Sequence, residues 1–163
     1  MTSVIVMGVA GCGKSAVARQ LAALRNLPWI EGDEFHPSAN VHKMREGIPL
    51  DDEDRAGWLR QLCDEVQKYP QGCVMACSAL KRSYRDRFRK AVPGVRFVYL
   101  HITPQESLRR VAERSGHFYP PSLVLSQFET LQDPSSEADV LRLDAMGPMH
   151  SMAEFAHKGL LKI

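Results

Sequence analysis

Residues 8–15 of the chain read GVAGCGKS, which matches the phosphate-binding pattern G-x-x-x-x-G-K-[ST] in full. A short hydrophobic run, Val4–Met7, precedes the pattern, and residues 16–21 have the composition of a helix. The pattern has a mechanism only when it connects a buried strand to a helix, and here both neighbours are present. We therefore interpret residues 8–15 as a phosphate loop, the opening unit of a fold with a parallel β-sheet.

The phosphate loop predicts that the chain binds a nucleoside triphosphate. Its glycines let backbone N–H groups face phosphate oxygens, and the following helix N-terminus adds positive potential. In this pattern the lysine, Lys14, reaches the β- and γ-phosphates, and the Ser15 hydroxyl ligates Mg²⁺. The predicted nucleotide-binding residues of the loop are Gly8, Val9, Ala10, Gly11, Cys12, Gly13, Lys14 and Ser15.

Length and composition limit the number of domains and the kinds of partner that we expect. A chain of 163 residues is long enough for one domain with a single core, so we expect one domain over 1–163. The net charge of +2 and the absence of a long basic tract argue against nucleic acid as a partner. The four cysteines lack zinc-ligand spacing, and no apolar stretch approaches the roughly 20 residues that span a bilayer. We expect a soluble cytoplasmic protein without a membrane partner.

Strand-like and helix-like segments alternate along the whole chain. Further strands are expected at 28–31, 73–77, 95–100 and 140–143. Helices are expected from Asp51, as N-cap, to about 68, and then at 81–90, 104–113 and 151–163. The pattern predicts a three-layer α/β/α fold with a central parallel sheet of about five strands. Ligands of such sheets bind at the carboxyl ends of the strands, where we expect the phosphate loop, residues 31–33, Ser78 and Asp144 to meet.

Several longer motifs resemble the gluconokinase family of small P-loop kinases. They follow one another in the family's order over nearly the whole chain: GDEFHP at 32–37, Asn40, Lys43-Met44, Gly47, Pro49-Leu50, Asp52, Asp54-Arg55, Trp58-Leu59, CSALK at 77–81, Tyr84-Arg85, Arg89, Gly116–Phe118 and SQFETL at 126–131. The resemblance implies ATP-dependent phosphorylation of D-gluconate at its 6-hydroxyl. It also implies a nucleoside-monophosphate-kinase-like fold with a mobile helical lid at about 114–135. A homodimer is the candidate assembly.

The candidates for the chemistry of transfer are Lys14, Asp33 and, from the lid segment, Arg114. Lys14 and Mg²⁺ would offset charge on the transferred group, and Asp33 would orient the acceptor hydroxyl and accept its proton. The alternative for Asp33 is an aspartate that only shapes a tight Gly-Asp turn. Glu31 is a second candidate for the metal, which it would hold through water; a surface acid without a role is the alternative.

Basic residues of the acceptor segment are candidates for binding the substrate. The family pattern places His36 and Lys43 at acceptor contacts, with loop packing as the alternative for His36. Arg45 and Arg55 are candidates for the carboxylate of gluconate, because a guanidinium matches a carboxylate in a bidentate fork. Each arginine has an alternative as a solvated charge or as an ion-pair partner of the acidic run 51–54.

The last candidates follow the apolar strand expected at 73–77 and the helix expected at 104–113. Ser78 and Lys81 stand where other P-loop enzymes often carry an acidic metal ligand, and Lys81 is also explained as a surface charge. Arg114 resembles the lid arginine that binds the γ-phosphate in this kinase class, with a helix-terminal charge as the alternative. His117 belongs to the same segment. The alternative functions are another small-metabolite kinase, for shikimate or a nucleoside monophosphate, and a nucleotide-binding regulatory module without transferase activity.

Overall fold

The strands form one sheet in which every pairing is parallel. The computed structural model describes residues 2–114 and 119–163. Its strands, all predicted from the sequence to within a few residues, are β1 (Val4–Met7), β2 (Trp29–Glu31), β3 (Val74–Ala76), β4 (Arg96–His101) and β5 (Val140–Asp144). Their order across the sheet is β2-β3-β1-β4-β5, with Val4 of β1 in register with Val74 on one side and Arg96 on the other.

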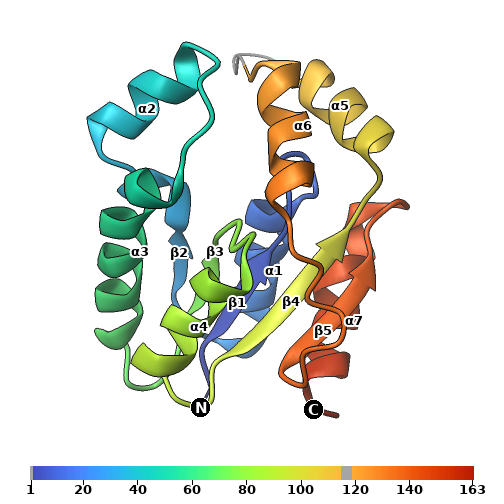
Figure 1. Cartoon of the computed structure of the whole chain (residues 1–163). Helices are drawn as coiled ribbons and strands as arrows, with labels where there is room; N and C mark the ends of the chain where they lie inside the picture. Colours follow the sequence, from blue (N-terminus) through green and yellow to red (C-terminus); the bar gives the residue numbers. More distant parts are fainter. Residues whose placement is uncertain (1, 115–118) are drawn as a thin grey trace.

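Helices cover both faces of the sheet, which confirms the predicted three-layer α/β/α fold (Figure 1). The helices are α1 (Lys14–Arg25), α2 (Ser38–Arg45), α3 (Asp52–Gln67), α4 (Arg82–Ala91), α5 (Pro104–Glu113), α6 (Pro121–Thr130) and α7 (Met152–Leu160). Two 3₁₀ turns, Gly32–Phe35 and Met149–Ser151, complete the described elements. The predicted terminal helix is thus shorter than 151–163. None of the described helices is long and apolar enough to span a membrane.

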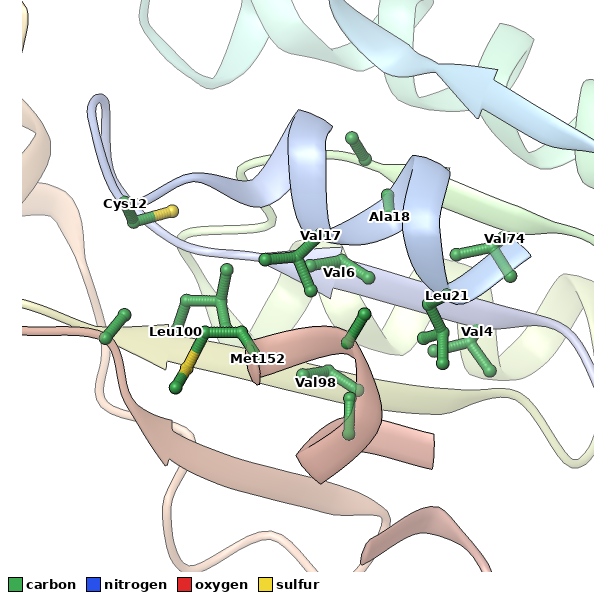
Figure 2. Packing of buried hydrophobic residues seen from close by; sticks show 14 of the residues in the cluster. Val4, Val6, Cys12, Val17, Ala18, Leu21, Val74, Val98, Leu100 and Met152 are labelled. Carbon is green, nitrogen blue, oxygen red and sulfur yellow. The ribbon is translucent and has the colours of Figure 1, made fainter. Parts of the chain in front are cut away.

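Alternating side chains of β1 divide the core into two layers. Val4 and Val6 pack against α1 and α7, and Figure 2 shows them beside Val17 and Leu21 of α1. Ile5 and Met7 point to the opposite face, where α3 and α4 cover them. A strand buried on both faces needs an unbroken apolar run, which is the pattern that residues 4–7 carry.

The start of α3 is fixed by a capping box around Asp51, the residue that the sequence predicts as its N-cap. The Asp51 carboxylate accepts the N–H of Asp54, and the Asp54 carboxylate accepts the N–H of Asp51 in return. This reciprocal pair satisfies two backbone donors that a helix N-terminus leaves open. The cap fixes where α3 begins, and α3 carries Arg55 and Trp58 towards the site described below.

Loops and helices at the carboxyl ends of the strands stand on two sides of the phosphate loop (Figure 1). One side is the segment after β2, with its 3₁₀ turn and α2; the other is formed by α5 and α6. The predicted lid segment, 114–135, contains α6. Residues 115–118 of that segment, including the predicted site residue His117, lie outside the described residues.

Candidate active site

A cavity of about 730 Å³ opens between the segment after β2 and helix α6. Its lining includes most of the residues that the sequence singles out: Ala10, Lys14, Ser15, Glu31, Asp33, His36, Arg45, Arg55, Ser78 and Arg114. A second hollow of about 570 Å³ lies beside α4 and the start of β5, and none of the predicted site residues lines it. The chemistry predicted from the sequence therefore belongs to the first cavity.

The phosphate loop has the geometry its glycines predict. Gly13 precedes α1 in a left-handed conformation, with φ of 90°, where a side chain would be strained. The Cys12 side chain points into the core beside β1 and α1, so this residue offers a ligand only its backbone (Figure 2). Burial is the main reason that the pKa of the Cys12 thiol is raised, and the thiol is therefore neutral.

The ammonium group of Lys14 and two carboxylates form the charged centre of the cavity. Burial by itself lowers the pKa of Lys14. Neighbouring groups, Asp33 and Glu31 among them, together raise the pKa by more than burial lowers it, so the net pKa lies above its ordinary value. Burial raises the pKa of Glu31, and its interactions with Ser15 and Lys14 offset part of that rise. Glu31 thus lies beside Ser15, the predicted Mg²⁺ ligand.

The 3₁₀ turn after β2 presents Asp33 to the cavity. The Asp33 side chain is 61% exposed, and its Oδ1 lies 3.9 Å from Nε2 of His36. Its backbone N–H donates to Glu31 Oε1 over 3.4 Å, and the Gly32 carbonyl before it accepts a 2.9 Å hydrogen bond from the Trp58 indole. Asp33 is therefore accessible to an acceptor hydroxyl and is held on a fixed backbone.

His36 is held as a neutral hydrogen-bonding group. Its ring stacks on Trp58, and the Asn40 amide lies 3.2 Å from Nδ1. Burial, assisted by the positive charge of Arg55, lowers the pKa of His36 to about 4, although Asp33 acts in the opposite direction. The Asn40 amide nitrogen donates to Nδ1, which assigns the ring proton to Nε2, on the side of Asp33.

The lysines and arginines predicted to contact the acceptor or the γ-phosphate divide into two groups. Arg45, Arg55 and Arg114 line the cavity. The structure does not bring the other two predicted residues, Lys43 and Lys81, into its lining. Lys43 binds both carboxylate oxygens of Asp54 at 2.9 Å, and Lys81 binds Asp52 at 2.8 Å, so both hold the acidic start of α3 instead.

Arg55 differs from the lysines in having no carboxylate partner among the residues that the structure describes. Its side chain is buried, and its guanidinium donates a 3.3 Å hydrogen bond to the Tyr84 hydroxyl. Within the described part of the chain, no acidic group lies within 4 Å of it. A buried guanidinium of this kind is costly unless an anion compensates it, and the cavity is where such an anion would bind.

Four polar or aromatic residues of the cavity were not predicted as site residues: Trp58, Tyr119, Ser126 and Gln127. In the sequence Trp58 belongs to the family motif Trp58-Leu59 without an assigned role, whereas in the structure its indole orients Gly32. Tyr119 has no local signal for function, and Gln127 of α6 belongs to the family motif SQFETL without a pattern that assigns it a role. Asp144 was expected at the site but does not line the cavity, because β4 and β5 lie on the far side of β1.

A phosphate loop facing a cavity that holds a carboxylate and a buried arginine defines a small P-loop kinase. Residues 4–134 match a family model described as an AAA domain. The thermosensitive gluconokinase of Escherichia coli is 40% identical over 99% of this chain and 88% of its own length. The gluconokinase of Gluconobacter oxydans is 44% identical over 85% of this chain and 80% of its own length.

A solved gluconokinase from Sinorhizobium meliloti superimposes with a TM-score of 0.92, at 42% identity, over 99% of this chain and 92% of that one. The chain belongs to the gluconokinase family. The resemblance seen in the acceptor-site motifs is thereby confirmed.

Proposed function

We propose that this chain transfers the γ-phosphoryl group of ATP to the 6-hydroxyl of D-gluconate, giving 6-phospho-D-gluconate and ADP. The observation that carries the proposal is Arg55, a buried guanidinium without an acidic partner among the described residues, in the same cavity as Lys14 and Asp33. The carboxylate of a sugar acid is the anion that such a group would bind in a bidentate fork. Gluconokinase relatives of similar length support the same substrate.

The residues divide the reaction between them. Asp33 accepts the proton of the 6-hydroxyl while the hydroxyl oxygen forms its bond to the γ-phosphorus, and the bond to the β–γ bridging oxygen breaks to release ADP. Lys14 and Arg114 stabilise the charge on the transferred group. The neutral His36 donates from Nε2 to a hydroxyl of the sugar acid. Arg55 fixes the opposite end of the acceptor, with Arg45 and Ser78 as further contacts.

Hard oxygen donors fit a magnesium ion at the loop. The Ser15 hydroxyl would hold it directly and Glu31 through water, while ATP phosphates supply the remaining ligands. Among the residues that the structure describes, no group of three metal-binding side chains occurs. When bound, Mg²⁺ neutralises phosphate charge.

The finer points of assembly and location belong to the same proposal. We infer that the enzyme acts in the cytoplasm on small molecules, without nucleic acid or membrane partners. The homodimer, the lid movement of 114–135 and the role of His117 stay predictions. Light scattering that finds the mass of one chain in place of two would remove the homodimer.

A coupled assay of ADP release tests the proposed reaction. The purified enzyme is assayed with Mg-ATP and D-gluconate, with shikimate, with AMP and without an acceptor. We expect ADP release with gluconate well above the other three, and one 6-phosphogluconate for each ADP. Equal release with and without gluconate would leave only a nucleotide-binding module, and stimulation by shikimate or AMP would identify a different kinase.

A further inference from the structure

Two helices hold the peptide groups on either side of Ala10, in the phosphate loop. The N–H of Ala10 donates a 2.7 Å hydrogen bond to Oε1 of Gln127, on α6. Its carbonyl accepts a 2.6 Å hydrogen bond from the hydroxyl of Ser107, a fully buried residue of α5. This N–H is therefore paired with protein, and it anchors α6 to the loop.

Apolar packing accompanies these two hydrogen bonds. Ala10 forms a small buried cluster with Val111 of α5 and Val124 of α6, and Tyr119 and Phe128 pack against it. Apolar contacts tolerate sliding, whereas a hydrogen bond of 2.7 Å fixes both distance and direction. The bond from Ala10 to Gln127 is thus the directional link between the phosphate loop and α6.

The same glutamine reaches the acceptor side of the cavity. Its side chain interacts with the phenol of Tyr119. That phenol lies close enough to Lys14 and Asp33 for their charges to shift its pKa. Gln127 and Tyr119 both line the cavity, together with Leu123 and Ser126 of α6. One side chain therefore touches the loop that binds the phosphates and the wall that encloses the acceptor.

We propose that Gln127 is a positioning residue, which fixes the α6 wall to the phosphate loop so that the γ-phosphate and the acceptor hydroxyl stay aligned and water stays out. The proposal rests on the proposed function. Transfer depends on alignment more than on covalent help from the protein, and a misplacement of about 1 Å costs roughly a hundredfold in rate. A loosened wall also admits water as a competing acceptor.

Two substitutions of Gln127 separate this role from simple packing. Gln127→Met keeps the length of the side chain but cannot accept the Ala10 hydrogen bond. We expect kcat with gluconate to fall roughly ten- to a hundredfold, the ratio of ADP to 6-phosphogluconate to rise above one, and the Kd for ATP to stay within about twofold. Gln127→Glu keeps the accepting oxygen and should restore the ratio to one, although its charge raises the KM for ATP. Glu129→Gln, an exposed change on α6, is the matched control.

Two kinetic outcomes would overturn the proposal. The first is a Gln127→Met enzyme with unchanged kcat and product ratio. The second is a Gln127→Glu enzyme as uncoupled as Gln127→Met, since the accepting oxygen would then be irrelevant.

Hydrogen exchange at the Ala10 amide tests the link without an assay. We expect slow exchange in the wild type and in Gln127→Glu, and exchange at least about tenfold faster in Gln127→Met. An unprotected Ala10 amide in the wild-type enzyme would overturn the proposal even if Gln127→Met does not fold. Because this readout needs no substrate, it also distinguishes failure of the link from failure of the proposed gluconate reaction.

Discussion

The imidazole of His36 stacks on the indole of Trp58, with ring centroids 4.1 Å apart and planes inclined by 15°. The same indole donates to the Gly32 carbonyl, one residue before Asp33. One buried tryptophan of α3 therefore orients both the predicted base and its neighbouring histidine. The stack also excludes water from the imidazole, which explains why burial is the main cause of its lowered pKa.

Stability should fall when acid protonates His36. The pKa of His36 is about 4 in the folded protein, against an ordinary value near 6.5, so the unfolded chain takes up the proton first as pH falls. The free energy of unfolding therefore has its full value above pH 6.5. Between pH 6.5 and 4 it falls by up to about 3 kcal/mol on account of His36. Urea unfolding against pH should show this slope in the wild type and in His42→Gln, an exposed control, but not in His36→Gln. Parallel profiles for all three proteins would contradict the assignment.

Asp33→Asn should remove most of the turnover and leave nucleotide binding intact. The amide keeps the size of the side chain but cannot accept the proton of the acceptor hydroxyl, so we expect kcat to fall by about a hundredfold. The Kd for ATP, measured by calorimetry, should change little because Lys14 and the phosphate loop are unaffected. The exposed neighbour Glu34→Gln is the control. Near-normal turnover of Asp33→Asn would leave Asp33 with only its role in the Gly-Asp turn.

Arg55→Lys should weaken the binding of gluconate selectively. Lysine keeps the charge but loses the fork that matches a carboxylate, and a charge-assisted pair of this kind contributes about 1.5–3 kcal/mol. The KM for gluconate should therefore rise about ten- to a hundredfold, with the KM for ATP unchanged. Arg60→Lys, an exposed change on the same helix, should leave both values as they are. A rise in the KM for ATP alone would place Arg55 at the nucleotide instead.

The fold was predictable because its elements are encoded locally. The apolar runs 4–7 and 73–77 identify buried strands, and Asp51 marks the start of α3 by its own side chain. The order of the strands is not local, since β3 pairs between β1 and β2 after a crossover through α3. For that reason the sequence does not show that Asp144 stays out of the cavity lining, although the loop after it reaches the phosphate loop, where Arg110 donates to the carbonyls of Gly11 and Ala145.

The roles of the basic residues likewise depend on contacts that are not local in the sequence. The sequence alone does not distinguish the positive charges of Lys43, Lys81 and Arg55. Their roles depend on which of them contacts an acidic residue of α3 in the folded protein. The pairing of Gln127 with Ala10 spans 117 positions of the chain, and no spacing rule reaches that far. Motif chemistry located the phosphate loop and Asp33; tertiary contacts alone reveal the residues that hold them.

Glu137→Gln should destabilise the protein although it lies outside the cavity. Glu137 binds Arg85 over 2.7 Å and Arg89 over 2.6 Å, and the Arg85 side chain is completely buried. Removing the charge leaves Arg85 uncompensated, which costs about 3–5 kcal/mol in pairs of this kind. The free energy of unfolding in urea measures the effect. Asp86→Asn, which breaks an exposed ion pair of Arg89, should cost less than about 1 kcal/mol. Equal costs would show that Arg85 finds other compensation.

Two glycine-to-alanine changes should shift the free energy of unfolding in opposite directions. A Cβ on Gly32 would lie 2.4 Å from the carbonyl oxygen of Ala76 in β3, a contact that only a backbone shift relieves. We expect Gly32→Ala to cost about 1–3 kcal/mol and to lower kcat, because Asp33 moves with the turn. A Cβ on Gly57, exposed within α3, meets nothing within 4 Å. Gly57→Ala should therefore stabilise the protein by about 0.5–1 kcal/mol with kcat unchanged, since it only removes backbone freedom from the unfolded chain. Thermal unfolding and the gluconate assay measure both effects. A Gly32→Ala enzyme that is as stable and as active as wild type would mean that the close approach of the Asp33 turn to β3 does not hold the candidate base in place.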